Sequence, residues 1–179
     1  TKLDALDDHP IAGVQFDIYS VNADGTTGDL VTSIITDNDG MALSASLLVG
    51  DYIVREHASP TGYVSELWSE NVTVKMDETL TLTVKNTPMQ GSIRIIKTDE
   101  ETQKPLPGAA FTVTRISGLP SHNGEGDGEI VAVITSDENG VAETPLLTWG
   151  EYEITESSVP DDYLDEGYSV RVFLPEIAK

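Results

Sequence analysis

Cysteine is absent from this 179-residue chain, which excludes disulfide bonds, thiolate nucleophiles and cysteine-ligated metal sites. Basic residues are few: 10 lysines and arginines stand against 31 aspartates and glutamates, so the formal net charge is −21. A chain this acidic repels phosphate groups, and we therefore expect it to bind neither nucleic acid nor an anionic membrane surface. Apolar runs are short, and none reaches the ~18 residues of a membrane-spanning helix. Hydrophobic residues still make up 39% of the chain, enough to bury a core.

The chain contains an internal repeat. Residues 10–16 (PIAGVQF) match residues 105–111 (PLPGAAF). Further residues correspond in the same order: Lys2 with Lys97, Asp4 with Asp99, Asp37 with Asp137, Gly40 with Gly140, Tyr52 with Tyr152, Glu56 with Glu156, and Tyr63 with Tyr163. We therefore expect two copies of one module, residues 1–88 and 89–179, with a longer loop at 117–129 in the second.

Short runs of alternating apolar and polar residues fill each module. Residues 72–76 and 80–84 alternate in this way, and the Asp-Gly at 39–40 is a hairpin-turn signal that the Asn-Gly at 139–140 repeats. No segment shows a sustained apolar period of about 3.6 residues, so we expect almost no helix. The pattern predicts an all-β fold of two tandem, immunoglobulin-like β-sandwich modules.

Strand alternation places three kinds of polar residue on the apolar face of their strands. Lys97 is in phase with Ile95, and Asn86 shares the apolar phase of its strand. Glu56 and Glu156 are in phase with the apolar residues that precede them. Burying an unpaired charge is costly, so these groups need a joint explanation.

Three interpretations are open. Strand ends lie near the surface, so each side chain could extend into water. A buried lysine–glutamate ion pair is a second explanation, although it gives the asparagine no role. The third interpretation joins all three groups: a desolvated lysine amine attacks the asparagine side-chain amide, and ammonia leaves. A protonated glutamate would hydrogen-bond the amide carbonyl and carry the protons. This single self-modification would leave a neutral amide in place of buried charges.

The same residues carry a family resemblance. The chain resembles the Cna B-type (prealbumin-like) domains of Gram-positive surface proteins and pilins, and the resemblance covers both modules. The motifs that carry it are Lys-x-Asp at 2–4 and 97–99, Pro-x-x-Gly-x-x-Phe at 10–16 and 105–111, Gly-x-Tyr-x-x-x-Glu at 50–56 and 150–156, and Val-Lys-Asn at 84–86.

The resemblance implies that lysine and asparagine lie on adjacent first and last strands, with the glutamate reaching them from the opposite sheet. Module one would then form a Lys2–Asn86 crosslink, with Glu56 as the catalytic residue. Module two has Lys97 and Glu156, but its last strand and partner asparagine would fall beyond residue 179. We expect a Lys97–Glu156 contact there in place of a bond, and a groove that a strand donor in trans can fill.

The function that follows is mechanical. We expect stalk modules of an extracellular, cell-wall-attached protein or pilin of a Gram-positive bacterium, with neighbouring domains of the same protein as partners. We expect no enzyme activity beyond the single self-modification, and no cofactor or metal, because His9, His57 and His122 lack metal-ligand spacing. The alternative is an adhesin that contacts a host protein or glycan through loop 117–129.

Overall fold

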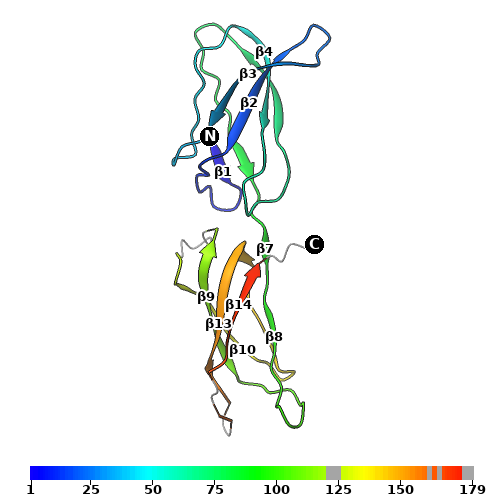
Figure 1. Ribbon diagram of the computed structural model, residues 1–179, viewed down its shortest axis with the longest axis vertical. Helices are drawn as coiled ribbons and strands as arrows, with labels where there is room; N and C mark the ends of the chain where they lie inside the picture. The colour runs from blue at the N-terminus through cyan, green and yellow to red at the C-terminus, as the bar shows by residue number, and fades with distance from the viewer. Residues whose placement is uncertain (120–125, 161–162, 165–166, 175–179) are drawn as a thin grey trace. The chain divides into compact units, whose positions relative to one another are not determined.

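The computed structural model describes residues 1–119, 126–160, 163–164 and 167–174, and all regular structure in them is β (Figure 1). The described residues contain no helix long and apolar enough to cross a membrane. The chain divides into two compact units, Thr1–Pro88 and Met89–Lys179. We describe each unit by itself and call them module one and module two.

Module one is built from a four-stranded antiparallel sheet and a parallel strand pair. The sheet has the order β3-β2-β4-β5, and Figure 1 shows β2, β3 and β4 side by side. Its strands are β2 Gln15–Val21, β3 Thr27–Ile35, β4 Gly50–Glu56 and β5 Ser69–Val74, and the parallel pair is β1 Lys2–Asp4 and β6 Val84–Asn86. The first and last strands of the module therefore lie next to each other.

Alternation on β6 sets the direction of the Asn86 side chain. Val84 and Asn86 are buried, whereas Lys85 between them is exposed. In the parallel register, Lys2 lies opposite Val84 and Asp4 opposite Asn86. The inward direction of Asn86 that the sequence predicts is confirmed.

Module two repeats the four-stranded sheet and adds two short antiparallel pairs. The sheet has the order β10-β9-β13-β14, β11 pairs with β8, and β12 pairs with β7. The strands are β7 Gln90–Gly91, β8 Arg94–Ile96, β9 Ala110–Gly118, β10 Ile130–Thr135, β11 Val141–Glu143, β12 Leu147–Thr148, β13 Gly150–Ser158 and β14 Ser169–Leu174. Inward residues of these strands form one apolar core, to which Phe111, Val113, Tyr152 and Ile154 contribute side chains at most 1% exposed. The all-β sandwich prediction is confirmed.

One predicted strand is shorter than the alternation suggests. Residues 80–83 lie outside any strand, and Leu80 is 48% exposed. The amino group of Thr1 donates a hydrogen bond to the Leu82 carbonyl (2.7 Å), at the end of the parallel pairing with β1. No described segment continues the pairing of β1 beyond Thr1 to reach residues 80–81, so alternation alone does not make them a strand.

A buried carboxylate ties β2 to its neighbours in module one. Asp17 on β2 accepts hydrogen bonds from Ser33 Oγ (2.6 Å) and Gln15 Nε2 (2.8 Å), and it pairs with His57 Nδ1 (2.7 Å). The hydrogen bond from Ser33, followed by those from Gln15 and His57, lowers the pKa of Asp17 to about 2. The folded state therefore gains stability from this carboxylate above the pKa of an unfolded aspartate. That gain disappears as the pH falls through about 2.

We predict that Asp17→Asn lowers the free energy of unfolding at neutral pH by up to about 2.5 kcal/mol, because a depression of nearly two pKa units corresponds to that energy. The loss should shrink between about pH 4 and pH 2, where the wild-type carboxylate takes up its proton. Urea denaturation at both ends of this range measures the effect. Asp29→Asn, an exposed position on β3, serves as the control and should change little. An equal loss at neutral pH and at about pH 2 would contradict the assignment.

Candidate functional site

Three buried polar side chains meet inside module one. Lys2 comes from β1, Glu56 from the end of β4 in the other sheet, and Asn86 from the end of β6. Their exposed fractions are 0%, 2% and 5%. The structure thus brings together the three residues that the sequence singles out, and none of them extends into water.

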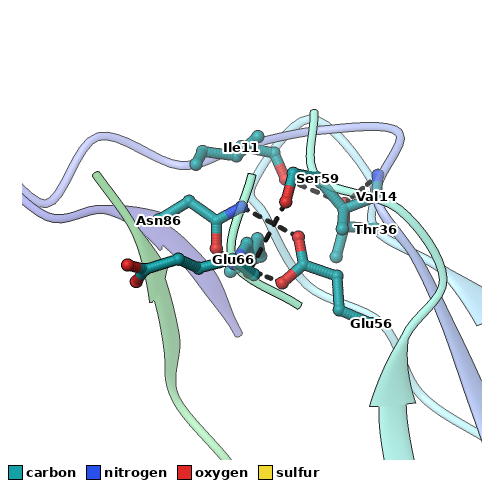
Figure 2. A network of polar contacts seen from close by, with 8 residues as sticks. Ile11, Val14, Thr36, Glu56, Ser59, Glu66 and Asn86 are labelled. Atoms are coloured by element: carbon teal, nitrogen blue, oxygen red, sulfur yellow. Dashed lines mark hydrogen bonds and ion pairs between the residues drawn. The ribbon is translucent and has the colours of Figure 1, made fainter. Parts of the chain in front are cut away.

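The carboxylate of Glu56 contacts both of the other groups. Lys2 Nζ lies 3.3 Å from Glu56 Oε2, and Asn86 Nδ2 donates to Glu56 Oε1 at 2.9 Å. Lys2 Nζ also donates to Asn86 Oδ1, which closes the triangle. Figure 2 shows the Glu56 carboxylate facing the side-chain amide of Asn86. An amine, an amide and a carboxylate are therefore in mutual contact without water between them.

Burial changes the protonation of the lysine. Removal from water lowers the pKa of the Lys2 ammonium, and the adjacent Glu56 carboxylate opposes part of that shift. A lower pKa increases the fraction of free amine at neutral pH. The free amine is the nucleophilic form, so the site favours attack on a nearby carbonyl carbon.

The orientation of the amide differs from the expected one. The expectation placed Glu56 on the Asn86 carbonyl, whereas the structure places it on Nδ2. The physical reason is that this orientation gives both ends of the amide a partner, because Asn86 Nδ2 donates to Glu56 Oε1 while Asn86 Oδ1 accepts from Lys2 Nζ. The carboxylate consequently lies beside the nitrogen that would leave, a direct position for delivering a proton to it.

The backbone of Lys2 is held on both sides by residues of the first half of module one. Lys2 N donates to the Gly40 carbonyl (2.7 Å), and Ile11 N donates to the Lys2 carbonyl (3.0 Å). Gly40 has a φ of +66°, and a Cβ there would overlap the Lys2 carbonyl oxygen. Glycine is required at this turn on both counts. These contacts fix the lysine strand although it begins at the second residue.

Two further polar contacts support the site, and the sequence motifs contain their residues without indicating a role. Tyr63 lies near Asp4 on the lysine strand, and burial together with the Asp4 carboxylate raises the pKa of Tyr63 above its usual range. Thr36 Oγ1 accepts from Val14 N (2.9 Å) and donates to the Ile11 carbonyl (2.8 Å), as Figure 2 shows. Asp4 and Tyr63 recur in module two as Asp99 and Tyr163, and this recurrence is the sequence signal that indicates a role for them.

Module two contains half of the same site. Lys97 Nζ lies 2.9 Å from Glu156 Oε2, so the predicted contact is present. The Lys97 side chain is 27% exposed and that of Glu156 is 4% exposed. Glu156 Oε1, the counterpart of the oxygen that accepts from Asn86, is buried and has no hydrogen-bond partner among the described residues. A buried acceptor without a donor is unfavourable, so this position suits an incoming amide.

The supporting contacts also recur in module two. Lys97 N donates to the Gly140 carbonyl (2.7 Å), and Leu106 N donates to the Lys97 carbonyl (3.0 Å). Tyr163 donates to Asp99 Oδ2 (2.9 Å) in place of the Tyr63–Asp4 contact. Module two is therefore built to hold its lysine in the same way.

Other candidate sites receive no support. In the described part of the chain, no three histidine, aspartate or glutamate side chains gather in a way that could hold a metal ion. His57 pairs with Asp17, and His122 lies outside the described residues. Loop 117–129, the alternative binding loop, includes residues 120–125, which also lie outside them.

The fold and the site define the class of protein. Two successive β-sandwich modules, the first with lysine and asparagine on its adjacent first and last strands, are a tandem prealbumin-like architecture. The chain matches the SpaA prealbumin-like fold domain family over residues 1–88 and again over 91–176, and it belongs to this family. The family is a structural one and not a family of enzymes. No curated protein sequence matches the chain.

Solved structures show the same fold. The TIE protein of Bacillus anthracis is 26% identical with a TM-score of 0.74, and the match covers 100% of this chain and 31% of that one. A C-terminal fragment of the pilus adhesin SpaC from Lactobacillus rhamnosus GG is 20% identical with a TM-score of 0.61, covering 97% of this chain and 80% of that one. The chain thus spans about a third of the length of the Bacillus protein.

We predict that Gly40→Ala destabilises module one more than Gly25→Ala does. Both glycines have positive φ, and each substitution costs about 1 kcal/mol for that reason. A Cβ at Gly25 meets nothing within 4 Å, whereas one at Gly40 overlaps the backbone of Lys2. Denaturation midpoints of the two variants test the difference, and equal midpoints would show that Gly40 does not hold the lysine strand.

Proposed function

We propose that module one forms an intramolecular amide (isopeptide) bond between Lys2 Nζ and Asn86 Cγ. The observation that carries the proposal is the buried triangle in which Glu56 contacts both the amine and the amide nitrogen. An ion pair alone would explain Lys2 and Glu56 but leaves the amide of Asn86 without a purpose in the core.

The reaction is an amide exchange. The free amine of Lys2 attacks Cγ of Asn86, a C–N bond forms, and the carbonyl electrons move to the oxygen. Glu56 takes a proton from the attacking nitrogen and delivers it to the amide nitrogen, so that the original C–N bond breaks and ammonia leaves. The product is a neutral secondary amide, and the protein turns over once without an external substrate.

The bond would join the two end strands of the module. A covalent link between residues 2 and 86 closes almost the whole module into a loop, which stabilises it by roughly 4–5 kcal/mol in chain-entropy terms. Force applied along the chain would pass through this bond and bypass the sandwich between its ends. We infer stalk modules of an extracellular, cell-wall-attached protein of a Gram-positive bacterium, because the family and a solved pilus adhesin share this fold.

Module two would complete its site with a strand from another segment. Glu156 Oε1, which has no partner among the described residues, and the partly exposed Lys97 suit a strand that carries an asparagine in the position of Asn86. Such a strand would pair with residues 97–99 as β6 pairs with β1 in module one. Its asparagine would then lose ammonia to Lys97.

The first test of the proposal is the intact mass of the purified chain. We predict that it is one ammonia lighter than the sequence requires, and that Lys2→Ala, Asn86→Ala and Glu56→Ala each restore the full mass. Each variant should also melt at a lower temperature, since each removes the same bond. Glu70→Ala, an exposed position on β5, is the matched control. An unshifted wild-type mass, or ammonia loss that persists in Glu56→Ala, would refute the mechanism.

A second test concerns module two. We predict that a synthetic peptide with the sequence of residues 80–86 (LTLTVKN) forms a covalent adduct with the chain, one ammonia lighter than the two together. The adduct should be absent with Lys97→Ala and with a peptide that ends in alanine. Adduct formation that does not depend on Lys97 would show that the strand binds elsewhere.

A further inference from the structure

Module one contains a large apolar groove outside the lysine site. Its volume is about 740 Å³, and it lies between the inner face of the four-stranded sheet and the segments 42–49 and 75–82. Phe16, Tyr52 and Trp68 are among the residues that line it. Protein interiors are normally close-packed, so an open apolar space of this size in a small domain requires an explanation.

The rim of the groove carries exposed apolar side chains among polar ones. Leu43, Leu48 and Met76 are 82%, 84% and 75% exposed, and each lines the groove. Residues 42–48 and 79–83, which flank it, belong to no strand. Among the described residues, these segments therefore lack the strand neighbours that a sandwich normally supplies, although the Leu48 carbonyl accepts a hydrogen bond from the Tyr52 hydroxyl.

The internal repeat shows what fills the corresponding space in module two. The apolar positions that line the groove have counterparts in the packed core of module two: Phe16 in Phe111, Ile18 in Val113, Ile34 in Ile134, Ala42 in Ala142, Leu47 in Leu147, Tyr52 in Tyr152, Val54 in Ile154, Val72 in Val172 and Val74 in Leu174. That core also includes Ile93 and packs against Ile95. Because Lys97 corresponds to Lys2, these two isoleucines have no counterpart within residues 1–88.

The strand pairing of module two also indicates that a strand belongs in this groove. The segment that carries the isoleucines pairs with residues 141–148: Ile95 lies opposite Ala142, and Gly91 opposite Leu147. In the part of the chain that the structure describes, no strand lies opposite the corresponding Ala42 and Leu47 of module one. The groove of module one thus has the place and the lining that β7 and β8 occupy in module two.

We propose that this groove is a strand-acceptor site for an extended polypeptide with aliphatic side chains at alternate positions. The strand would run in the direction of β1 and end beside Thr1. It would pair with residues 42–48 on one side and with residues 79–82 on the other, where the Thr1 amino group already bonds the Leu82 carbonyl. Two unpaired backbone edges favour a polypeptide over a lipid, because an acyl chain satisfies no N–H or C=O group.

The test joins the strand to the chain. The sequence of residues 89–95 (MQGSIRI) is fused directly before Thr1, so that its two isoleucines take the positions that Ile93 and Ile95 hold before Lys97. The control fusion replaces both isoleucines by serine. Trp149→Phe is introduced throughout, which leaves Trp68 in the groove as the one tryptophan of the chain.

The fused isoleucine strand should shift the emission of Trp68 to shorter wavelength and slow amide exchange of residues 42–48 and 79–83 by about tenfold or more. The serine fusion should do neither. The free peptide, added in excess, should produce the same protection more weakly. A strand that leaves the exchange of both segments unchanged, or a serine fusion that protects them equally, would overturn the proposal.

A fluorescent apolar dye separates a strand site from a general apolar pocket. The unfused chain should bind the dye at Trp68, and the isoleucine fusion should displace it. Dye that stays bound at Trp68 in the fused protein would also overturn the proposal. Lys2→Ala can be introduced in all these experiments, so neither result depends on the isopeptide bond. Failure of this proposal can therefore be distinguished from failure of the proposed function.

Discussion

Module one depends on the removal of three polar side chains from water. A lysine that is 0% exposed would be a severe defect if it remained charged and unpaired. Its contacts with Glu56 and Asn86 offset that cost, and burial shifts the lysine toward the neutral amine. The same desolvation that is costly for the fold lowers the pKa of Lys2, on which the proposed reaction depends. The surrounding backbone contacts of Lys2 hold its strand in place beside Glu56 and Asn86.

Much of this arrangement could be predicted from the sequence because strands impose a strict period of two. That period alone placed Glu56, Glu156 and Asn86 on the inner face, and the structure buries all three. The repeat then located Lys2, whose own strand is too short to show a phase. The turns at Gly40 and Gly140 were predicted correctly, with both glycines at positive φ, but the predicted hairpins are wrong. Among the described residues, no strand follows the first turn before Gly50, and β11 after the second turn pairs with β8 and not with β10.

Other features could not be predicted because they depend on contacts between distant segments. The strand expected at 80–84 needs a partner along its whole length, and alternation says nothing about whether one is present. The amide orientation of Asn86 is decided by hydrogen-bond donors and acceptors in three dimensions. Tyr63 and Asp4 belong to two motifs that lie far apart in the sequence, and the spacing of the motifs does not indicate that these two side chains lie near each other.

The parallel pairing of β1 with β6 determines how this module responds to pulling. The two strands run in the same direction, and they lie at opposite ends of the module in the sequence. A force on the two ends of the module therefore drags them past each other along their length. All the hydrogen bonds between them are loaded together, whereas strands peeled from one end break their bonds one after another. This shear geometry resists extension through hydrogen bonds alone, so the folded module can bear load without a covalent link between the two strands.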